Sequence, residues 1–171
     1  MKKCLNEWNA TVEALGQGKQ TILIRKYGTN VKKFLLRPTA SYALKDNFQD
    51  SFETEYKTFA GANALPKQED GKTEIKYYAE VEDVVEKSAQ RIGTLKKYHI
   101  WTSDHVKSYL NNKKAQIWIL RVYKLKNPVM AENKGGIRYC NLLGEVSLEG
   151  MEPVLDDAAF LKLQKEIKSR K

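Results

Sequence analysis

The stretch Ala115–Leu125, which reads AQIWILRVYKL, decides the fold of this chain. Apolar side chains occupy successive positions from Ile117 to Leu120, so a strand here would be buried on both faces. The stretch therefore predicts a central β-strand. Arg121 interrupts the apolar run, and a buried guanidinium must either find a structural partner or line a pocket. The sequence leaves both roles open.

The segments around this strand predict an α+β fold with one domain over residues 1–171. Helices and strands do not alternate regularly, which favours a largely antiparallel sheet flanked by helices. A polar stretch with two glycines and a proline predicts a mobile loop over about 61–73, and Asp156 and Asp157 are expected to cap the helix that follows. The expected strands cover about 20–26 and 34–37 as a hairpin, 75–81, 115–125 and parts of 137–148. The expected helices cover about 5–15, 47–60, 81–92, a short segment after Thr102 or Ser103, and about 157–169.

The composition is that of a basic protein. The 171 residues include 30 Lys+Arg against 21 Asp+Glu, a formal net charge of +9. Residues 91–150 alone carry eleven basic and four acidic side chains. A clustered positive field attracts phosphates, which favours nucleic acid or another polyanion as the partner. The alternatives are that the lysines serve solubility, or that the basic surface meets an acidic protein.

Several classes of protein are excluded or disfavoured. No run approaches the roughly 18 apolar residues of a membrane span, so no membrane partner is expected. The two isolated cysteines, Cys4 and Cys140, indicate a reducing compartment and predict a cytoplasmic protein. The sequence shows no motif for a metal or a cofactor, and neither is expected.

Basic side chains near the predicted hairpin are candidates for an anion site. Arg25 ends the first strand, and Arg37 precedes Pro38 and Thr39 at the end of the second. A hydroxyl group beside a guanidinium is suited to contact an anion. The alternative is a solvated strand edge whose charges oppose aggregation.

A second candidate is the segment Tyr98–Trp101, which joins an imidazole to aromatic rings within the basic part of the chain. Trp101 is suited to stack on a base, and His99 is the side chain best suited to transfer protons near neutral pH. His99 is therefore the one catalytic candidate, although a buried histidine between aromatic rings more often has a structural role. Whether the chain is an enzyme is left open.

Short segments spread over nearly the whole chain form a joint pattern, and they are Glu7-Trp8, Ala14-Leu15 with Gly18, Ile24-Arg25-Lys26 with Gly28, Leu36 with Pro38-Thr39, Tyr98-His99-Ile100-Trp101, Leu120-Arg121-Val122-Tyr123, Ser147-Leu148-Glu149-Gly150 and Pro153-Val154-Leu155-Asp156-Asp157-Ala158-Ala159. Together these segments resemble an uncharacterised prokaryotic family, domain of unknown function 1802. After Pro38-Thr39 the family tends to have an aromatic residue and then a histidine, whereas Ala40-Ser41-Tyr42 follows here. Any chemistry that depends on that histidine would be absent from this chain.

The resemblance implies an accessory role in DNA restriction or defence, because members of the family occur joined to a restriction-endonuclease-like domain. Together with the charge, it favours a protein that binds nucleic acid or another polyanion. The alternative is an enzyme or sensor that binds a small anion or nucleotide in the same basic pocket. In either case the expected ligand-binding residues are Arg25, Arg37, Thr39, His99, Trp101 and Arg121.

Overall fold

The computed structural model describes residues 1–40 and 43–170. Nine strands form one sheet, in which the order β2-β6-β5-β3-β1-β8-β7 gives the main path, and β4 and β9 pair with β5 and β6. The strands are β1 (Lys3–Trp8), β2 (Ile22–Arg25), β3 (Lys33–Thr39), β4 (Gln68–Glu69), β5 (Lys72–Lys87), β6 (Ala115–Ala131), β7 (Asn133–Lys134), β8 (Tyr139–Leu142) and β9 (Glu152–Pro153). The α-helices are α1 (Asn9–Gly16), α2 (Lys57–Ala62), α3 (Ser103–Leu110) and α4 (Asp157–Ser169), and the 3-10 helices are η1 (Phe48–Ser51), η2 (Thr54–Tyr56) and η3 (Ala89–Tyr98).

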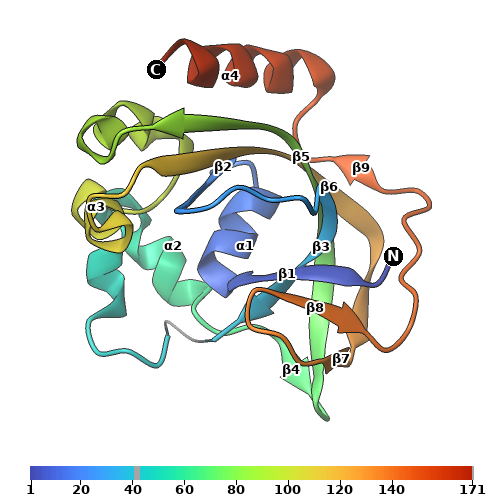
Figure 1. Cartoon of the computed structure of the whole chain (residues 1–171). Coiled ribbons are helices and arrows are strands. Elements are labelled where there is room, and N and C mark those ends of the chain that lie inside the picture. Colours follow the sequence, from blue (N-terminus) through green and yellow to red (C-terminus); the bar gives the residue numbers. More distant parts are fainter. Residues whose placement is uncertain (41–42, 171) are drawn as a thin grey trace.

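The sheet confirms the predicted α+β class. Within residues 1–40 and 43–170, only β1 and β3 pair in parallel, and all other neighbouring strands pair antiparallel. The predicted central strand is the N-terminal part of β6, which pairs with β2 on one side and with β5 on the other. Figure 1 shows that the sheet curves around α1 and that α4 covers the outer side of β5 and β6.

Helix α1 lies inside the curved sheet, and every residue from Asn9 to Leu15 is buried. Its polar side chains therefore need partners within the protein. Asn9 donates to the backbone carbonyls of Asn63 and Leu65 at 2.8 and 3.1 Å. Glu13 accepts from the Tyr77 hydroxyl at 3.1 Å and forms an ion pair with Lys76. These contacts fix the central helix to β5 and to the segment after α2.

The predicted helix over about 5–15 is wrong in its first half, because Lys3–Trp8 is strand β1. Cys4 and Leu5 are both buried, since β1 lies between β3 and β8. A strand that is buried on both faces shows no alternation, and the apolar residues of this strand also fit the helical spacing that continues in α1.

The predicted hairpin is also wrong, because the strands at its two ends are not neighbours. β2 pairs with β6, whereas β3 pairs with β1 and β5. Nearness in sequence favours a hairpin, but the long pair of β5 and β6 occupies the middle of the sheet and separates the two strands. Consequently Arg25 and Arg37 lie on different parts of the sheet.

The predicted helix over 81–92 is strand in its first half, since β5 continues to Lys87 and η3 follows. The register of β5 against β6 shifts between Val81 and Asp83. Such a bulge adds a residue to one strand, which moves the next apolar side chains to helix-like spacing. The segments 47–60 and 61–73 also differ from expectation: the first consists of η1, η2 and the start of α2, and the second contains the end of α2 and the β4–β5 hairpin.

The N-terminal caps of α3 and α4 follow the chemistry expected from the sequence. Thr102 accepts a hydrogen bond from the backbone N–H of His105 at 3.0 Å at the start of α3. Asp156 accepts from the N–H of Ala159 at 2.7 Å at the start of α4. Over the described residues, no helix combines the length and apolar character that a membrane crossing requires. Ser41 and Tyr42, where the chain departs from the family pattern, lie outside the described residues.

Candidate functional site

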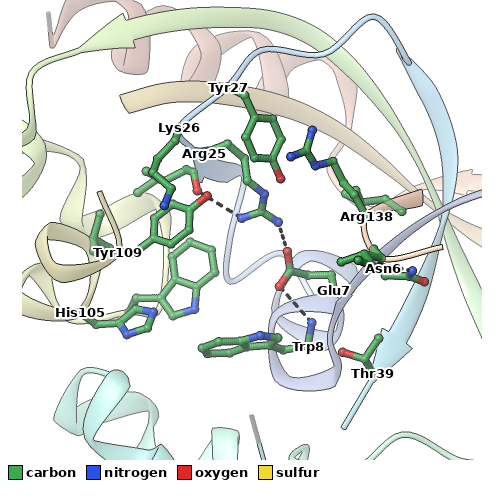
Figure 2. A pocket seen from close by; sticks show the side chains of 15 residues that line it. Asn6, Glu7, Trp8, Arg25, Lys26, Tyr27, Thr39, His105, Tyr109 and Arg138 are labelled. Atoms are coloured by element: carbon green, nitrogen blue, oxygen red, sulfur yellow. Dashed lines mark hydrogen bonds and ion pairs between the residues drawn. The ribbon is translucent and has the colours of Figure 1, made fainter. Parts of the chain in front are cut away.

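A cleft of about 500 Å³ opens where the curved sheet brings β2 opposite β1. Three further parts of the chain complete its wall: the end of β3, Trp101 together with helix α3, and the segment before β8. Figure 2 shows the side chains converging from these elements. The lining residues are Leu5, Asn6, Glu7, Trp8, Ile24, Arg25, Lys26, Tyr27, Thr39, Trp101, His105, Val106, Tyr109, Ile137 and Arg138.

An ion pair between Glu7 and Arg25 spans the inner part of the cleft. It joins β1 to β2, which are separated along the sheet by β3, β5 and β6. Glu7 also accepts a hydrogen bond from the backbone N–H of Trp8 at 3.0 Å, and Arg25 donates to the Ile24 carbonyl at 3.2 Å. Burial is the largest single effect and opposes the charge of Arg25, but Glu7, together with Tyr27 and Tyr109, outweighs it and raises the pKa of the guanidinium. The pair is therefore charged on both sides and neutral as a unit.

Aromatic rings form most of the remaining wall. Trp8 comes from β1, Tyr27 follows β2, Trp101 follows η3, and His105 and Tyr109 come from α3. The rings of Trp8 and His105 are 5.6 Å apart between centroids. Burial, followed by the charge of Lys45, lowers the pKa of His105, which favours the neutral imidazole. The wall therefore combines flat apolar surfaces with hydrogen-bonding edges.

Two exposed cations flank the opening. Lys26 lies over the Tyr109 ring, with Nζ 4.8 Å from the ring centroid. Arg138 lies over the Tyr27 ring, with Cζ of its guanidinium 3.4 Å from the ring centroid. In Figure 2 they stand on opposite sides of Arg25. Neither forms an ion pair with a carboxylate in the described part of the chain. Their charges are thus available to an anion that approaches from solvent.

Three of the six ligand-binding residues predicted from the sequence line this cleft, namely Arg25, Thr39 and Trp101. Arg37 lies beside the cleft without lining it. Its Nη1 donates to Oδ1 of Asn6 at 3.3 Å, while its buried Nε has no hydrogen-bond partner among the described residues. Arg37 thus supports a lining residue from behind.

The structure places His99 in the core, where it is 2% exposed. Its Nδ1 accepts a hydrogen bond from the backbone N–H of Trp101 at 3.2 Å, and the two rings lie 5.5 Å apart. Burial, and then the neighbouring His105, lowers the pKa of His99 to about 4. His99 is therefore a neutral, buried imidazole outside the cleft, and it positions Trp101. His105 is the imidazole that reaches the cleft wall.

Arg121 lies away from the cleft, beneath α4. Its Nη2 donates to Asp157 at 2.8 Å and to the Leu155 carbonyl at 3.0 Å, and its guanidinium lies over the Phe160 ring at 4.9 Å. The space beside it amounts to about 10 Å³, less than a ligand needs. Arg121 therefore has the structural role that the sequence left as one alternative, and it does not join the other predicted site residues.

Several lining residues were not predicted as site residues from the sequence. Glu7 and Tyr109 had no signal of their own, since an acid at a strand end and a tyrosine on a short helix are common features. Arg138 lies in the basic region of residues 91–150, but nothing marked it within that region. Glu7-Trp8 and Arg25-Lys26 do belong to the segments that carry the family resemblance. That shared pattern was the signal in the sequence that included Glu7 as well as Arg25, one from each side of the cleft.

The family model described as "Domain of unknown function (DUF1802)" matches residues 4–166. The chain belongs to this family. All residues that line the cleft fall within the matched range. The family assignment confirms the resemblance seen in the sequence and leaves the function to be inferred from the site.

Comparison with solved structures finds ASCH from Zymomonas mobilis. Its crystal structure has 11% sequence identity and a TM-score of 0.46, with 95% of this chain and 93% of that chain covered. A point mutant of the same protein has 12% identity and a TM-score of 0.47, with 74% and 72% covered. At these values the similarity assigns neither a fold family nor a function to this chain. No curated protein matches the sequence.

Proposed function

We propose that this protein binds nucleic acid through the cleft between β1 and β2. The observation that carries the proposal is the combination of two unpaired, exposed cations at the opening with aromatic rings in the wall. Basic side chains supply the affinity for phosphates, and aromatic side chains supply stacking surfaces for bases. Arg25, Thr39 and Trp101 belong to the same wall, so half of the site expected from the sequence is retained.

The rest of the surface favours the same partner. The formal net charge is +9, and the part of the chain that includes α3, β6 and Arg138 carries most of the excess. A field of this sign concentrates polyanions near the protein before specific contacts form. The cleft then determines where on the surface the bound chain is held.

Paired charge-removal variants test the proposal. The Lys26→Ala/Arg138→Ala variant is expected to weaken binding to a fluorescein-labelled single-stranded oligonucleotide, to a similar degree for every sequence, as measured by anisotropy. Lys162→Ala/Lys165→Ala is the matched control, because it also removes two exposed positive charges but from α4, outside the cleft. Equal losses in both variants would show a diffuse charge effect and contradict a site at the cleft.

A second candidate function is a sensor or enzyme for a small anion or nucleotide. The volume of the cleft favours it, since about 500 Å³ lies within the usual range of small-molecule sites. Thermal denaturation distinguishes the two candidates. A shift with a mononucleotide but none with an oligonucleotide would favour the small-molecule site, and the reverse would favour nucleic-acid binding.

An accessory role in DNA restriction or defence is part of the proposal and is supported by the family resemblance alone. The proposal also places the protein in the cytoplasm, where Cys4 and Cys140 would remain free thiols. To test whether the partner in the cell is DNA or RNA, the protein is recovered from its host together with the bound nucleic acid. Loss of that nucleic acid after treatment with DNase or with RNase then identifies the partner.

A further inference from the structure

We propose that the cleft accepts one unpaired nucleobase, and that Glu7 selects bases that carry an exocyclic amino group. This inference rests on the proposed function and specifies its ligand. Three features of the cleft support it: the separation of charge between its interior and its opening, the arrangement of its rings, and the hydrogen-bonding capacity that remains on Glu7.

The charge of the cleft is divided between an inner and an outer part. Inside, the Glu7–Arg25 pair is neutral as a unit and largely buried. At the opening, Lys26 and Arg138 are exposed and carry positive charge without a paired carboxylate in the described chain. A phosphate in the interior would meet the Glu7 carboxylate, whereas a phosphate at the opening meets only cations. The matching ligand is a neutral group that enters the cleft with an anion attached behind it.

The wall of the cleft is suited to a flat ring. Trp8, Trp101 and Tyr109 come from three separate elements and contribute their rings to the same space. Aromatic side chains stack on bases of any sequence. In a duplex both faces of each base are already covered by neighbouring bases, so only a base that is unpaired and unstacked can use these rings. A volume of about 500 Å³ is suited to one such unit rather than to a paired helix.

Glu7 retains the capacity to accept further hydrogen bonds. A carboxylate offers about four lone-pair sites. One oxygen of Glu7 accepts from the Trp8 backbone N–H and the other pairs with Arg25, and the residue still lines the cleft. Cytosine, adenine and guanine each carry an amino group that donates to an acceptor of this kind. Thymine and uracil carry no amino group, and their N3–H lies between two carbonyl oxygens that a carboxylate repels.

The test uses the unmodified protein and four probes of ten nucleotides or base pairs: oligo-dC, oligo-dT, an abasic deoxyribose-phosphate chain, and a duplex. Competition anisotropy gives each affinity. We expect oligo-dC to bind about 10- to 100-fold more tightly than the abasic chain, the range for one stacked base. We expect oligo-dT to bind about tenfold more weakly than oligo-dC, from the loss of a hydrogen bond to a charged group. Oligo-dC is also expected to quench the fluorescence of Trp8 and Trp101, whereas the abasic chain is not.

The outcomes separate this inference from the proposed function. If all four probes bind equally and salt weakens them equally, nucleic-acid binding stands and the base site is overturned. If oligo-dT binds as tightly as oligo-dC, the selection by Glu7 is overturned. If no probe binds even at low salt, the proposed function itself fails.

Two variants test the wall and the acid separately. Tyr109→Leu should reduce the difference between oligo-dC and the abasic chain about tenfold. Tyr56→Leu is its control, because Tyr56 is also half-buried but lies outside the cleft. Glu7→Gln should remove the preference for oligo-dC over oligo-dT. Glu7→Gln leaves Arg25 without its carboxylate and can therefore prevent folding. In that case Tyr109→Leu still tests the inference.

Discussion

Two largely buried arginines on the same sheet have different surroundings. Arg25 pairs with Glu7 beside a cleft of about 500 Å³, whereas Arg121 pairs with Asp157 beside a space of about 10 Å³. Both satisfy the rule that a buried charge needs a partner. The open space beside the pair, rather than the arginine, therefore distinguishes the candidate site from a structural contact. The two carboxylates also differ, because Glu7 is 6% exposed and Asp157 is 90% exposed.

The largest expected contrast comes from removing the two carboxylates. Glu7→Ala leaves the Arg25 guanidinium buried without its partner and should lower the free energy of unfolding by about 3–5 kcal/mol. Asp157→Ala removes an exposed partner and should lower it by about 1 kcal/mol or less. Urea denaturation of the two variants measures both values. Equal losses would contradict the view that the two pairs differ in burial and function.

The two histidines extend the comparison, since His99 is in the core and His105 is in the cleft wall. The pKa of His99 is lowered from 6.5 to about 4, so the folded state binds its proton less tightly than the unfolded state does. The resulting stability is present above about pH 6.5 and is lost as the pH falls toward 4, a change of about 3 kcal/mol. Urea denaturation between pH 4 and 7 should therefore show a steeper loss for the native protein than for His99→Gln. A parallel pH dependence of the two proteins would refute this assignment.

A smaller effect is expected at Arg121 and is confined to stability. Arg121→Ala removes the contacts with Asp157 and the Leu155 carbonyl and should lower the free energy of unfolding by about 1–3 kcal/mol. Its affinity for an oligonucleotide should equal that of the native protein, measured by anisotropy under conditions where both are folded. Loss of binding with unchanged stability would place Arg121 in the site and reverse the comparison with Arg25.

The sequence predicted those parts of the fold that depend on a continuous local pattern. The unbroken apolar run of Ala115–Leu125 marked β6, and the Asp156 cap marked the start of α4. The pairing of β1 with β3 was not predictable in the same way. In β1, Cys4 and Leu5 are buried on opposite faces, and each β1 residue pairs with a residue 31 positions later in the chain, as in Cys4 with Leu35. The sequence does not determine such long-range pairing through local periodicity.

The cleft was predictable only in part for the same reason. Arg25, Thr39 and Trp101 were predicted from residue type and from their neighbours in sequence, and they line the cleft. Glu7 and Arg138 belong to the site because curvature of the sheet brings β1, β2 and the segment before β8 together. Their role depends on that three-dimensional arrangement, and neither residue has an unusual local context. Arg121 shows the converse: as a charged residue within an apolar run it has an unusual local context, but the structure gives it a structural contact rather than a place in the cleft.

The most direct test of nucleic-acid binding at the cleft is a salt titration of oligonucleotide affinity. For single strands, the logarithm of the affinity falls with the logarithm of salt concentration by about 0.7 for each phosphate contacted. Removing both Lys26 and Arg138 should therefore make the slope shallower by about 1.4, while the Lys162→Ala/Lys165→Ala control keeps the native slope. The absence of binding by the native protein at about 50 mM salt, or an unchanged slope in Lys26→Ala/Arg138→Ala, would contradict the account.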